Sequence, residues 1–120
     1  MSTLQCTNIQ DTSGGNSRTT AQIYSGTAKA WIQFSGTTIN SQFNVSSLTK
    51  NATGDYTITF SNAMPDANYS FTGMVSETGS SAPVIVSKQG IAPTASALRI
   101  GEGDSTGLKD MTYSSIAIFR

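Results

Sequence analysis

Residues 56–60 read Tyr-Thr-Ile-Thr-Phe, in which large apolar side chains alternate strictly with threonine. Successive side chains of a β-strand point to opposite faces, so the two aromatic residues and Ile58 share one face and Thr57 and Thr59 share the other. Threonine suits the solvated face of a strand because its branched Cβ favours extended backbone. The stretch therefore predicts a half-buried antiparallel strand whose aromatic and isoleucine side chains lie in the core.

The same period of two recurs on both sides of this stretch. In residues 28–34, Ala-Lys-Ala-Trp-Ile-Gln-Phe, the alanine, isoleucine and phenylalanine side chains share one face, and Lys29, Trp31 and Gln33 share the other. The final run, Met-Thr-Tyr-Ser-Ser-Ile-Ala-Ile-Phe at residues 111–119, is predicted to be a strand and is apolar on both faces, which is typical of a central or interface strand. Further strands are expected at residues 43–48 (beginning with Phe43 and Val45 inward), 69–75, 83–87 and 97–100.

Clusters of Gly, Pro, Asn and Asp separate these runs and predict turns or loops at residues 50–55, 64–68, 77–82 and 101–107. No window keeps a helical period, so no helix is expected. About seven short strands separated by such turns indicate an all-β fold, as a β-sandwich, a jelly roll or a small barrel. Among these we expect a single antiparallel, jelly-roll-like β-sandwich domain over residues 28–120.

Residues 1–27 differ in composition from the rest of the chain. The stretch from Asp11 to Thr20 contains no apolar side chain and two adjacent glycines. Such a segment cannot bury enough surface to offset the entropy lost on ordering. We expect an extended N-terminal arm over residues 1–27 that either stays flexible or orders against a partner or a neighbouring subunit. The residues able to dock it are Leu4, Ile9, Ile23 and Tyr24.

The composition excludes several classes of protein. Seven Lys and Arg balance seven Asp and Glu, only 12% of residues are charged, and Ser and Thr make up 35 of the 120 residues. Without net positive charge or a basic cluster, no nucleic-acid partner is expected. No long apolar stretch predicts a membrane span, and the polar N-terminus does not resemble a secretory signal, so we expect synthesis in a cytoplasm. A single cysteine, Cys6, leaves no internal disulfide framework.

Catalytic chemistry finds little support. The chain has no histidine, the usual base beside a nucleophile. The seven carboxylates are all expected in turns, loops or the arm, where such groups serve solvation and capping. Glu102 and Asp104 could offer oxygens to Ca²⁺, but they lack the ordered ligand alternation of an EF-hand loop. We therefore expect no enzyme, no cofactor and no metal site.

Trp31 is the most informative single residue, because it lies opposite the apolar face of its strand. Three interpretations stay open for it. It is a core residue covered by the arm, an anchor in a subunit interface, or a platform on which a sugar stacks. With the four arm residues, it completes the predicted partner-binding set.

Several segments together resemble a virion module of tailed bacteriophages, found in marine and cyanobacterial phages. These segments are Lys29-Ala-Trp-Ile-Gln-Phe34, Phe43-Asn-Val-Ser-Ser47, Thr53-Gly-Asp-Tyr-Thr-Ile-Thr-Phe60, Ala63-Met-Pro-Asp-Ala-Asn-Tyr69 and Ile118-Phe-Arg120. The resemblance covers nearly the whole chain, including the lead-in Asn8-Ile-Gln-Asp-Thr-Ser-Gly14. It implies a position on the virion exterior, no catalytic residues, and a homotrimer.

Two functions are compatible with this resemblance. The first is a capsid decoration (cement) protein that binds the major capsid protein or another virion protein and stabilises the head shell. The second is a tail-fibre or receptor-binding tip that contacts host surface glycans. The short length, without a shaft, favours decoration. A cellular adhesion or carbohydrate-binding module fits the composition but not the resemblance.

Overall fold

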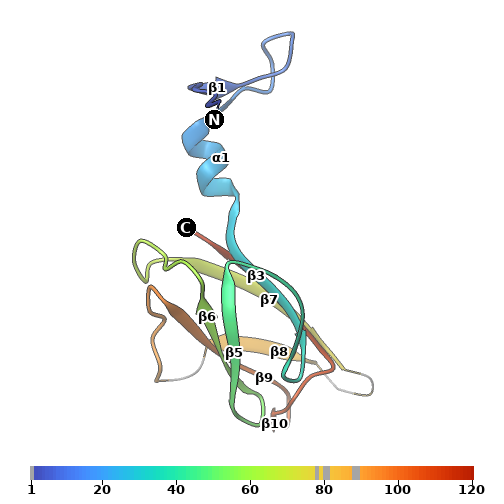
Figure 1. Cartoon of the computed structure of the whole chain (residues 1–120). Helices are drawn as coiled ribbons and strands as arrows, with labels where there is room; N and C mark the ends of the chain where they lie inside the picture. Colours follow the sequence, from blue (N-terminus) through green and yellow to red (C-terminus); the bar gives the residue numbers. More distant parts are fainter. Residues whose placement is uncertain (1, 78, 80–81, 88–89) are drawn as a thin grey trace.

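The structure, a computed structural model, describes residues 2–77, 79, 82–87 and 90–120. A narrow arm formed by the N-terminal residues projects from one end of a β domain (Figure 1). The fold is mostly β, with 52% of residues in strands and, in the described part, one short helix. Its antiparallel sheets are separate and packed together without closing into a barrel, which confirms the all-β prediction.

The arm and the β domain have different elements. The arm contains β1 (Asn8–Ile9), β2 (Arg18–Thr19) and α1 (Thr20–Gly26). The β domain contains β3 (Ala28–Ser35), β4 (Thr38–Phe43), β5 (Val45–Ala52), β6 (Asp55–Phe60), β7 (Ser70–Ser76), β8 (Val84–Ser87), β9 (Ala97–Asp104), β10 (Gly107–Leu108) and β11 (Tyr113–Phe119).

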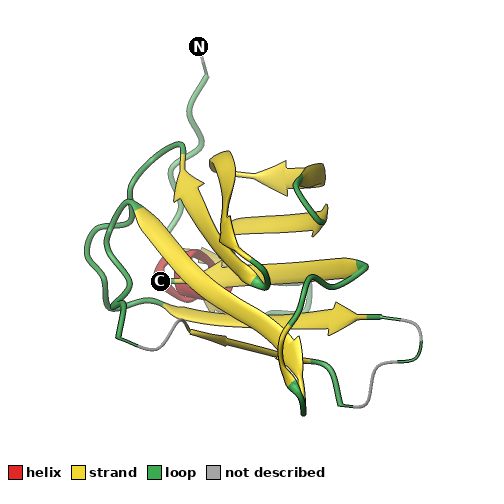
Figure 2. Ribbon diagram, turned by 90° about the horizontal axis from the view of Figure 1, so that it is seen from below, coloured by secondary structure: helices red, strands yellow, loops and turns green. Residues whose placement is uncertain are grey.

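Two sheets make up the β domain, and Figure 2 views them along the molecule. One has the strand order β4-β3-β11-β7. The other has the order β10-β9-β6-β5, with β8 paired to the edge of β9 opposite β6. Strand β11 lies between β3 and β7, so the prediction of a central strand at the end of the domain is confirmed.

The core lies between the two sheets. The rings of Phe34 from β3 and Tyr56 from β6 meet with their centroids 5.3 Å apart, which joins the two layers. The predicted inward faces are confirmed, since Tyr56, Ile58 and Phe60 are buried. The buried cluster comprises Ala30, Ile32, Phe34, Val45, Tyr56, Ile58, Phe60, Met64, Tyr69, Leu98, Ile100, Ile116 and Ile118.

The turn between β5 and β6 requires a glycine. Gly54 has φ +63°, a conformation that a Cβ atom disfavours. A Cβ there would also collide with the carbonyl oxygen of Glu102 and lie 2.5 Å from the amide nitrogen of Lys109. The turn predicted at residues 50–55 is thus confirmed at its centre. The turn at 64–68 is irregular as well, with the Asn68 amide donating to the Asp66 carboxylate at 2.8 Å.

The prediction that the chain contains no helix is wrong at α1. A capping box begins this helix: the Gln22 amide donates to Thr19 Oγ1 at 3.1 Å, and the Thr19 amide donates to Gln22 Oε1 at 2.9 Å. The helix has seven residues and buries none of them. A segment this short, without a buried face, has no hydrophobic period for sequence reasoning to detect.

The single strand predicted over residues 43–48 is also wrong. Asn44, at φ +57°, divides it, so that Phe43 ends β4 in one sheet and Val45 begins β5 in the other. The Asn44 side chain holds this crossing by donating to the Lys29 carbonyl at 3.0 Å and accepting from the Asn62 amide at 2.8 Å. As a result Val45 is buried, whereas Phe43 is exposed.

The loop predicted at residues 101–107 is largely strand. Strand β9 continues to Asp104, and β10 pairs with its end. A Cβ on Gly103 would lie 2.9 Å from Cα of Leu108, so glycine here permits two backbones to approach closely. The loop predicted at 77–82 lies partly outside the described residues.

Candidate functional site

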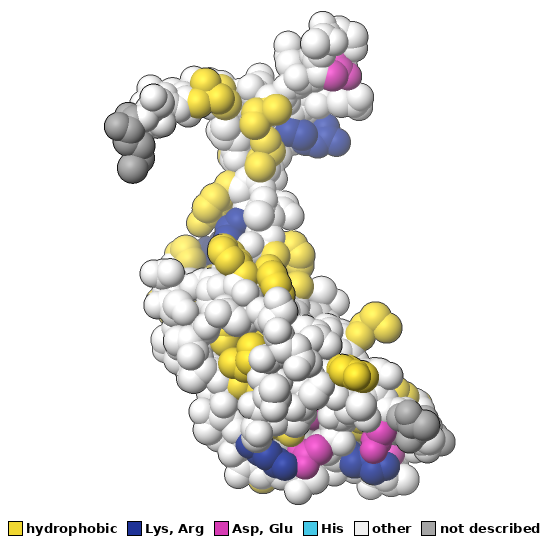
Figure 3. Space-filling model, turned by 45° about the vertical axis from the view of Figure 1, so that its right-hand side comes forward, with side chains coloured by type: hydrophobic (Ala, Val, Ile, Leu, Met, Phe, Trp, Pro, Cys, Tyr) yellow, Lys and Arg dark blue, Asp and Glu magenta, His cyan; other side chains and the backbone are white. Residues whose placement is uncertain are grey.

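The arm exposes every one of its described residues. Of the predicted docking residues, Leu4 precedes β1 and Ile9 lies in β1, far from the β domain, whereas Ile23 and Tyr24 lie on α1 between β1 and that domain (Figure 1). Leu4 is 88% exposed and Tyr24 60%. The arm therefore displays apolar side chains along its length, and Figure 3 shows them in yellow.

Local polar bonds set the conformation of the arm. In the turn between β1 and β2, the Asp11 carboxylate accepts from the Ser13 hydroxyl at 2.8 Å and from Asn16 Nδ2 at 3.1 Å. These bonds, the one from Ser13 first, hold the pKa of Asp11 below its ordinary value. The hydrogen bonds of the capping box likewise set the conformation at the start of α1. The glycine-rich segment is thus shaped by hydrogen bonds, with no buried side chain to support it.

The junction between the arm and the β domain forms a shallow groove. Side chains of α1, the beginning of β3 and Phe43 line a space of about 440 Å³. Lys29 closes one side, with Nζ 3.8 Å from the centroid of the Tyr24 ring and donating to the carbonyls of Tyr24 and Thr27. The Lys29 ammonium is therefore held by partners within the chain, although none of these partners is a carboxylate. The groove itself offers mainly apolar surface from Ile23, Tyr24 and Phe43.

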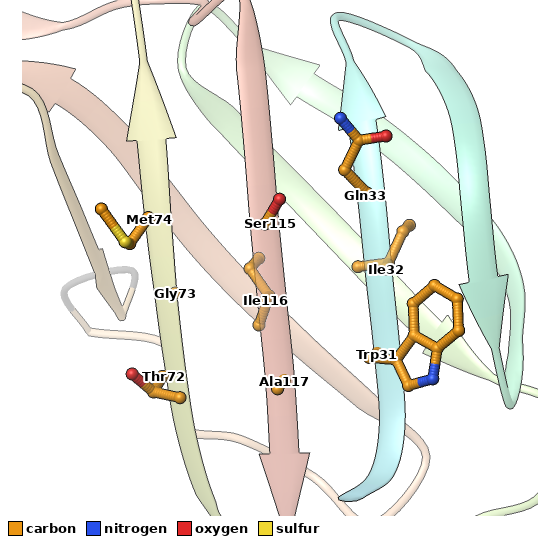
Figure 4. Close-up of a pocket in the computed structure, with 9 residues that line it drawn as sticks. All are labelled: Trp31, Ile32, Gln33, Thr72, Gly73, Met74, Ser115, Ile116 and Ala117. Carbon is orange, nitrogen blue, oxygen red and sulfur yellow. The ribbon is translucent and has the colours of Figure 1, made fainter.

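Trp31 lies on the outer face of the sheet β4-β3-β11-β7, so the interpretation of Trp31 as a core residue covered by the arm is wrong. It is 38% exposed and borders a groove of about 510 Å³. Figure 4 shows this groove crossing β3, β11 and β7, with Met74 on its far side. Met74 is 79% exposed. The interpretations of Trp31 as an interface anchor or a ligand platform both stay predictions.

The two grooves form one continuous surface. Phe43 lies directly opposite Trp31 in the register of β3 and β4, and Ala117 lies opposite Trp31 on β11. Directly opposed residues in a sheet point to the same face. We call the set Ile23, Tyr24, Phe43, Trp31 and Met74 the apolar strip.

Sequence reasoning found three members of the apolar strip and missed two. Phe43 was assigned to the inward face, because the break at Asn44 was not visible in the sequence. Met74 carried a usable signal, since it alternates with the inward Val75 and so had to point outward.

Charged side chains concentrate elsewhere. Figure 3 shows a few charged side chains on the arm and at its junction, and a larger group of Lys, Arg, Asp and Glu at the opposite end of the β domain. Ion pairs there join Lys50 to Asp110 at 2.5 Å and Lys109 to Asp104 at 3.1 Å. Of the residues that line the two grooves, Lys29 alone is charged. The apolar strip is therefore suited to a neutral, partly apolar partner.

The prediction that all carboxylates lie in turns, loops or the arm is wrong for Asp55, which is buried at the start of β6, and for Asp104 at the end of β9. It is also wrong for Glu102, which is buried within β9. One of its oxygens accepts from the Met111 amide at 3.0 Å and the other from the Ser114 hydroxyl. Burial, opposed by these bonds, raises the pKa of the carboxyl. Since both oxygens are bonded within the chain, the suggested calcium role of Glu102 with Asp104 is not supported. Glu102 instead fastens the segment before β11 to β9.

A second carboxylate completes this polar cluster. Asp110 accepts from the Gly54 amide at 2.9 Å and from the Tyr56 hydroxyl at 2.8 Å. Desolvation opposes the charge on Asp110, but the bonds from Gly54, Lys50 and Tyr56 outweigh it and lower the pKa. The cluster holds the turn between β5 and β6 against the segment that leads into β11.

Two further observations apply to the part of the chain that the structure describes. No group of three or more His, Cys, Asp or Glu side chains there could hold a metal ion. No helix in that part is long and apolar enough to cross a membrane. Comparison with known proteins found no family model, no curated protein and no solved structure that matches this chain.

Proposed function

We propose that this chain is a non-enzymatic structural protein on the exterior of a tailed-phage particle, and specifically a capsid decoration protein. It is made in the host cytoplasm and acts as a homotrimer bound to the major capsid protein or another virion protein. The observation that carries the proposal is the fully exposed arm with its apolar side chains. The resemblance of the sequence to phage virion modules supplies the setting.

The exposed arm supports a protein partner. A seven-residue helix and a hairpin of two-residue strands are marginal in water when they pack against nothing. A partner surface would supply the missing burial and order the arm in place. The zero net charge and the apolar strip favour a protein surface over nucleic acid.

We also propose that the two packed sheets form a jelly-roll-like β-sandwich. The adjacency of the first and last strands of the domain, β3 and β11, supports this description. The hairpin pairs β3–β4 and β5–β6 each stay within one sheet, so the likeness concerns the two-layer architecture more than strict jelly-roll strand order.

The copy number per particle tests the decoration proposal directly. In purified particles that carry the protein, its band would be measured against the major capsid protein by quantitative gel densitometry. A decoration protein is present in hundreds of copies, whereas a tail appendage is present in a few to a few tens. A count in the lower range would replace decoration with the tail-fibre function.

Removal of the arm tests how the protein attaches. A variant lacking residues 1–20 should keep its β-sheet circular dichroism but lose binding to capsids stripped of decoration. The matched control is Val84→Ser, an exposed apolar position on β8 of the other sheet. Unchanged occupancy by the arm-deleted protein would place the docking surface on the β domain.

The tail-fibre alternative draws on one observation. The indole of Trp31 borders a groove that Gln33, Thr72 and Ser115 also line. The groove therefore offers an aromatic plane beside amide and hydroxyl groups. Sugars bind to such combinations of stacking and hydrogen bonding. Quenching or a shift of the Trp31 fluorescence on titration with host surface glycans would support this function.

A further inference from the structure

We infer that the partner covering the apolar strip is a second copy of this chain, with the arms of neighbouring copies side by side and parallel. Ile23, Tyr24, Phe43 and Trp31 of each copy then face the axis that relates the copies. The inference deepens the proposed homotrimer, because it assigns the surface and orientation of self-association. It does not depend on which virion component the assembled protein binds.

The area of exposed surface supports an obligatory partner. The chain exposes 7327 Å², whereas a compact monomer of 12.6 kDa exposes roughly 6,200 Å². The excess of about 1,100 Å² exceeds the roughly 800 Å² that each partner buries in a stable protein–protein interface. The radius of gyration is 17.3 Å, against about 13.6 Å for a compact chain of this length. Both measures describe a molecule that is incomplete as a monomer.

The shape of the strip favours a parallel neighbour. It begins on α1, crosses the junction at Phe43 and continues along β3 to Trp31, so it extends over both the arm and the β domain. The molecule is 53 Å long and about 28 Å across. A parallel copy covers the arm and domain portions of the strip together. A small globular partner would cover one portion and leave the other exposed.

The surface that a second copy would cover carries few charges. Copies around a common axis bring identical groups close together, so unpaired like charges on the contact surface would repel. Lys29, the one charged residue that lines the grooves, is already bonded to the Tyr24 and Thr27 carbonyls. The ion pairs of Lys50 and Lys109 lie at the end of the domain away from the arm, whereas Arg120 pairs with Asp66 at 2.6 Å at the C-terminus, beside the base of the arm (Figure 1). Self-association therefore brings one like charge per copy, that of Lys29, toward the axis, and the carbonyls and the Tyr24 ring offset it only in part.

The solution mass of the full chain, measured by light scattering between 1 and 100 µM, is the primary test of this inference. We expect a mass above that of the monomer. Trp31→Thr and Ile23→Ser should each raise the dissociation constant of the oligomer, and for Trp31→Thr the increase should be about 30-fold. The matched control, Val86→Ser, removes an exposed apolar side chain of β8 and should leave the mass unchanged. Circular dichroism and the melting temperature would verify that each variant is folded.

Cys6, the single cysteine, reports on the orientation of the copies. It is exposed and lies in the arm, so donor and acceptor dyes attached to it in separate batches test whether the arms are neighbours. The expected result is energy transfer on mixing, with Trp31→Thr requiring a higher protein concentration for the same transfer. A monomeric mass at all concentrations would overturn the inference. So would an oligomer insensitive to both strip variants, or one without transfer between the labelled arms.

The outcomes separate this inference from the proposed function. If the copy number on particles shows no decoration but the strip variants abolish the oligomer, the function fails and the inference stands. If the protein decorates capsids as a monomer, the inference and the proposed homotrimer fail and the decoration role stands.

Discussion

The arm and the β domain are ordered by different kinds of interaction. Each element of the arm depends on hydrogen bonds between residues close in sequence, such as the Thr19–Gln22 capping box and the bonds to Asp11. The β domain depends on pairing between distant strands and on a core of buried side chains. The comparison teaches that a segment can have well-defined local structure without the burial needed to maintain it. Mutations should therefore act on the two regions with different magnitudes and different readouts.

The largest effect should come from the core. Ile58→Ala should lower the free energy of unfolding by about 2–5 kcal/mol, because Ile58 is completely buried and truncation leaves a cavity. Thr59→Ala, its neighbour on the outer face of β6, should cost well under about 1 kcal/mol. Urea denaturation of both variants measures the difference. Equal losses would show that the facing of β6 is not the source of the stability.

Two glycine substitutions compare the regions directly. Gly54→Ala should destabilise by about 1–3 kcal/mol or more, because φ +63° strains alanine and its Cβ meets the Glu102 carbonyl. Gly26→Ala, at the end of α1, meets nothing within 4 Å and should leave global unfolding unchanged while raising the helix content of the arm. Denaturation midpoints and circular dichroism would test the pair. A similar destabilisation by both would show that the arm is coupled to the core.

The buried carboxylate predicts a pH dependence located in the β domain. The pKa of Glu102 is raised by burial, so the folded state binds its proton more tightly than the unfolded state. Its contribution to stability is therefore present below the ordinary value of 4.5 and decreases as the pH rises above it. Glu102→Gln, which carries no charge, should gain stability relative to the wild type as the pH is raised from 4 to 7.

Asp66→Asn is the control for this prediction. Hydrogen bonds from Arg120, then from the Asn68 amide, lower the pKa of Asp66. Its contribution is therefore present above pH 3.8 and lost on acidification, so the difference between variant and wild type should have the opposite sign. Denaturation midpoints at several pH values measure both. A constant difference between Glu102→Gln and the wild type would contradict the assignment.

The smallest global effect should come from the arm. Thr19→Ala removes the capping box, which is worth about 1 kcal/mol to a helix. Because α1 buries nothing, the loss should appear as roughly fivefold faster amide exchange in α1, with no change in global unfolding. Hydrogen exchange followed by NMR distinguishes local opening of α1 from global unfolding. Thr20→Ala, which leaves the capping box in place, is the control. A lower free energy of global unfolding would mean that the arm folds together with the domain.

The strictly alternating parts of the fold could be predicted from the sequence, and the exceptions have physical causes. The facing of residues 56–60 followed from their period of two, because one face is buried and the other is not. The crossing at Asn44 left no trace, since a single residue at positive φ redirects the chain without interrupting the apolar pattern. Glu102 was missed because its partners, Met111 and Ser114, reach it only where the chain turns back between β9 and β11, which lie in different sheets.

For the candidate surface, the alternation of β3 predicted that Trp31 lies opposite the apolar face, but it did not predict whether the arm covers Trp31. The placement of Phe43 beside it required the register of two strands, which the sequence does not contain. The helix in the arm was missed because its capping residues, Thr19 and Gln22, are common in this Ser- and Thr-rich chain and gave no distinctive signal.

The pairing of β3 with β11 has a consequence for synthesis on the ribosome. Strand β3 is the first strand of the β domain to emerge and β11 the last, yet they are neighbours in one sheet. The edge of β3 that pairs with β11 therefore stays unpaired until the chain has been translated through β11, at residue 119. Nascent chains that stop before Tyr113 should stay sensitive to protease and bind chaperones, and folding should begin only after release of the C-terminal strand from the exit tunnel.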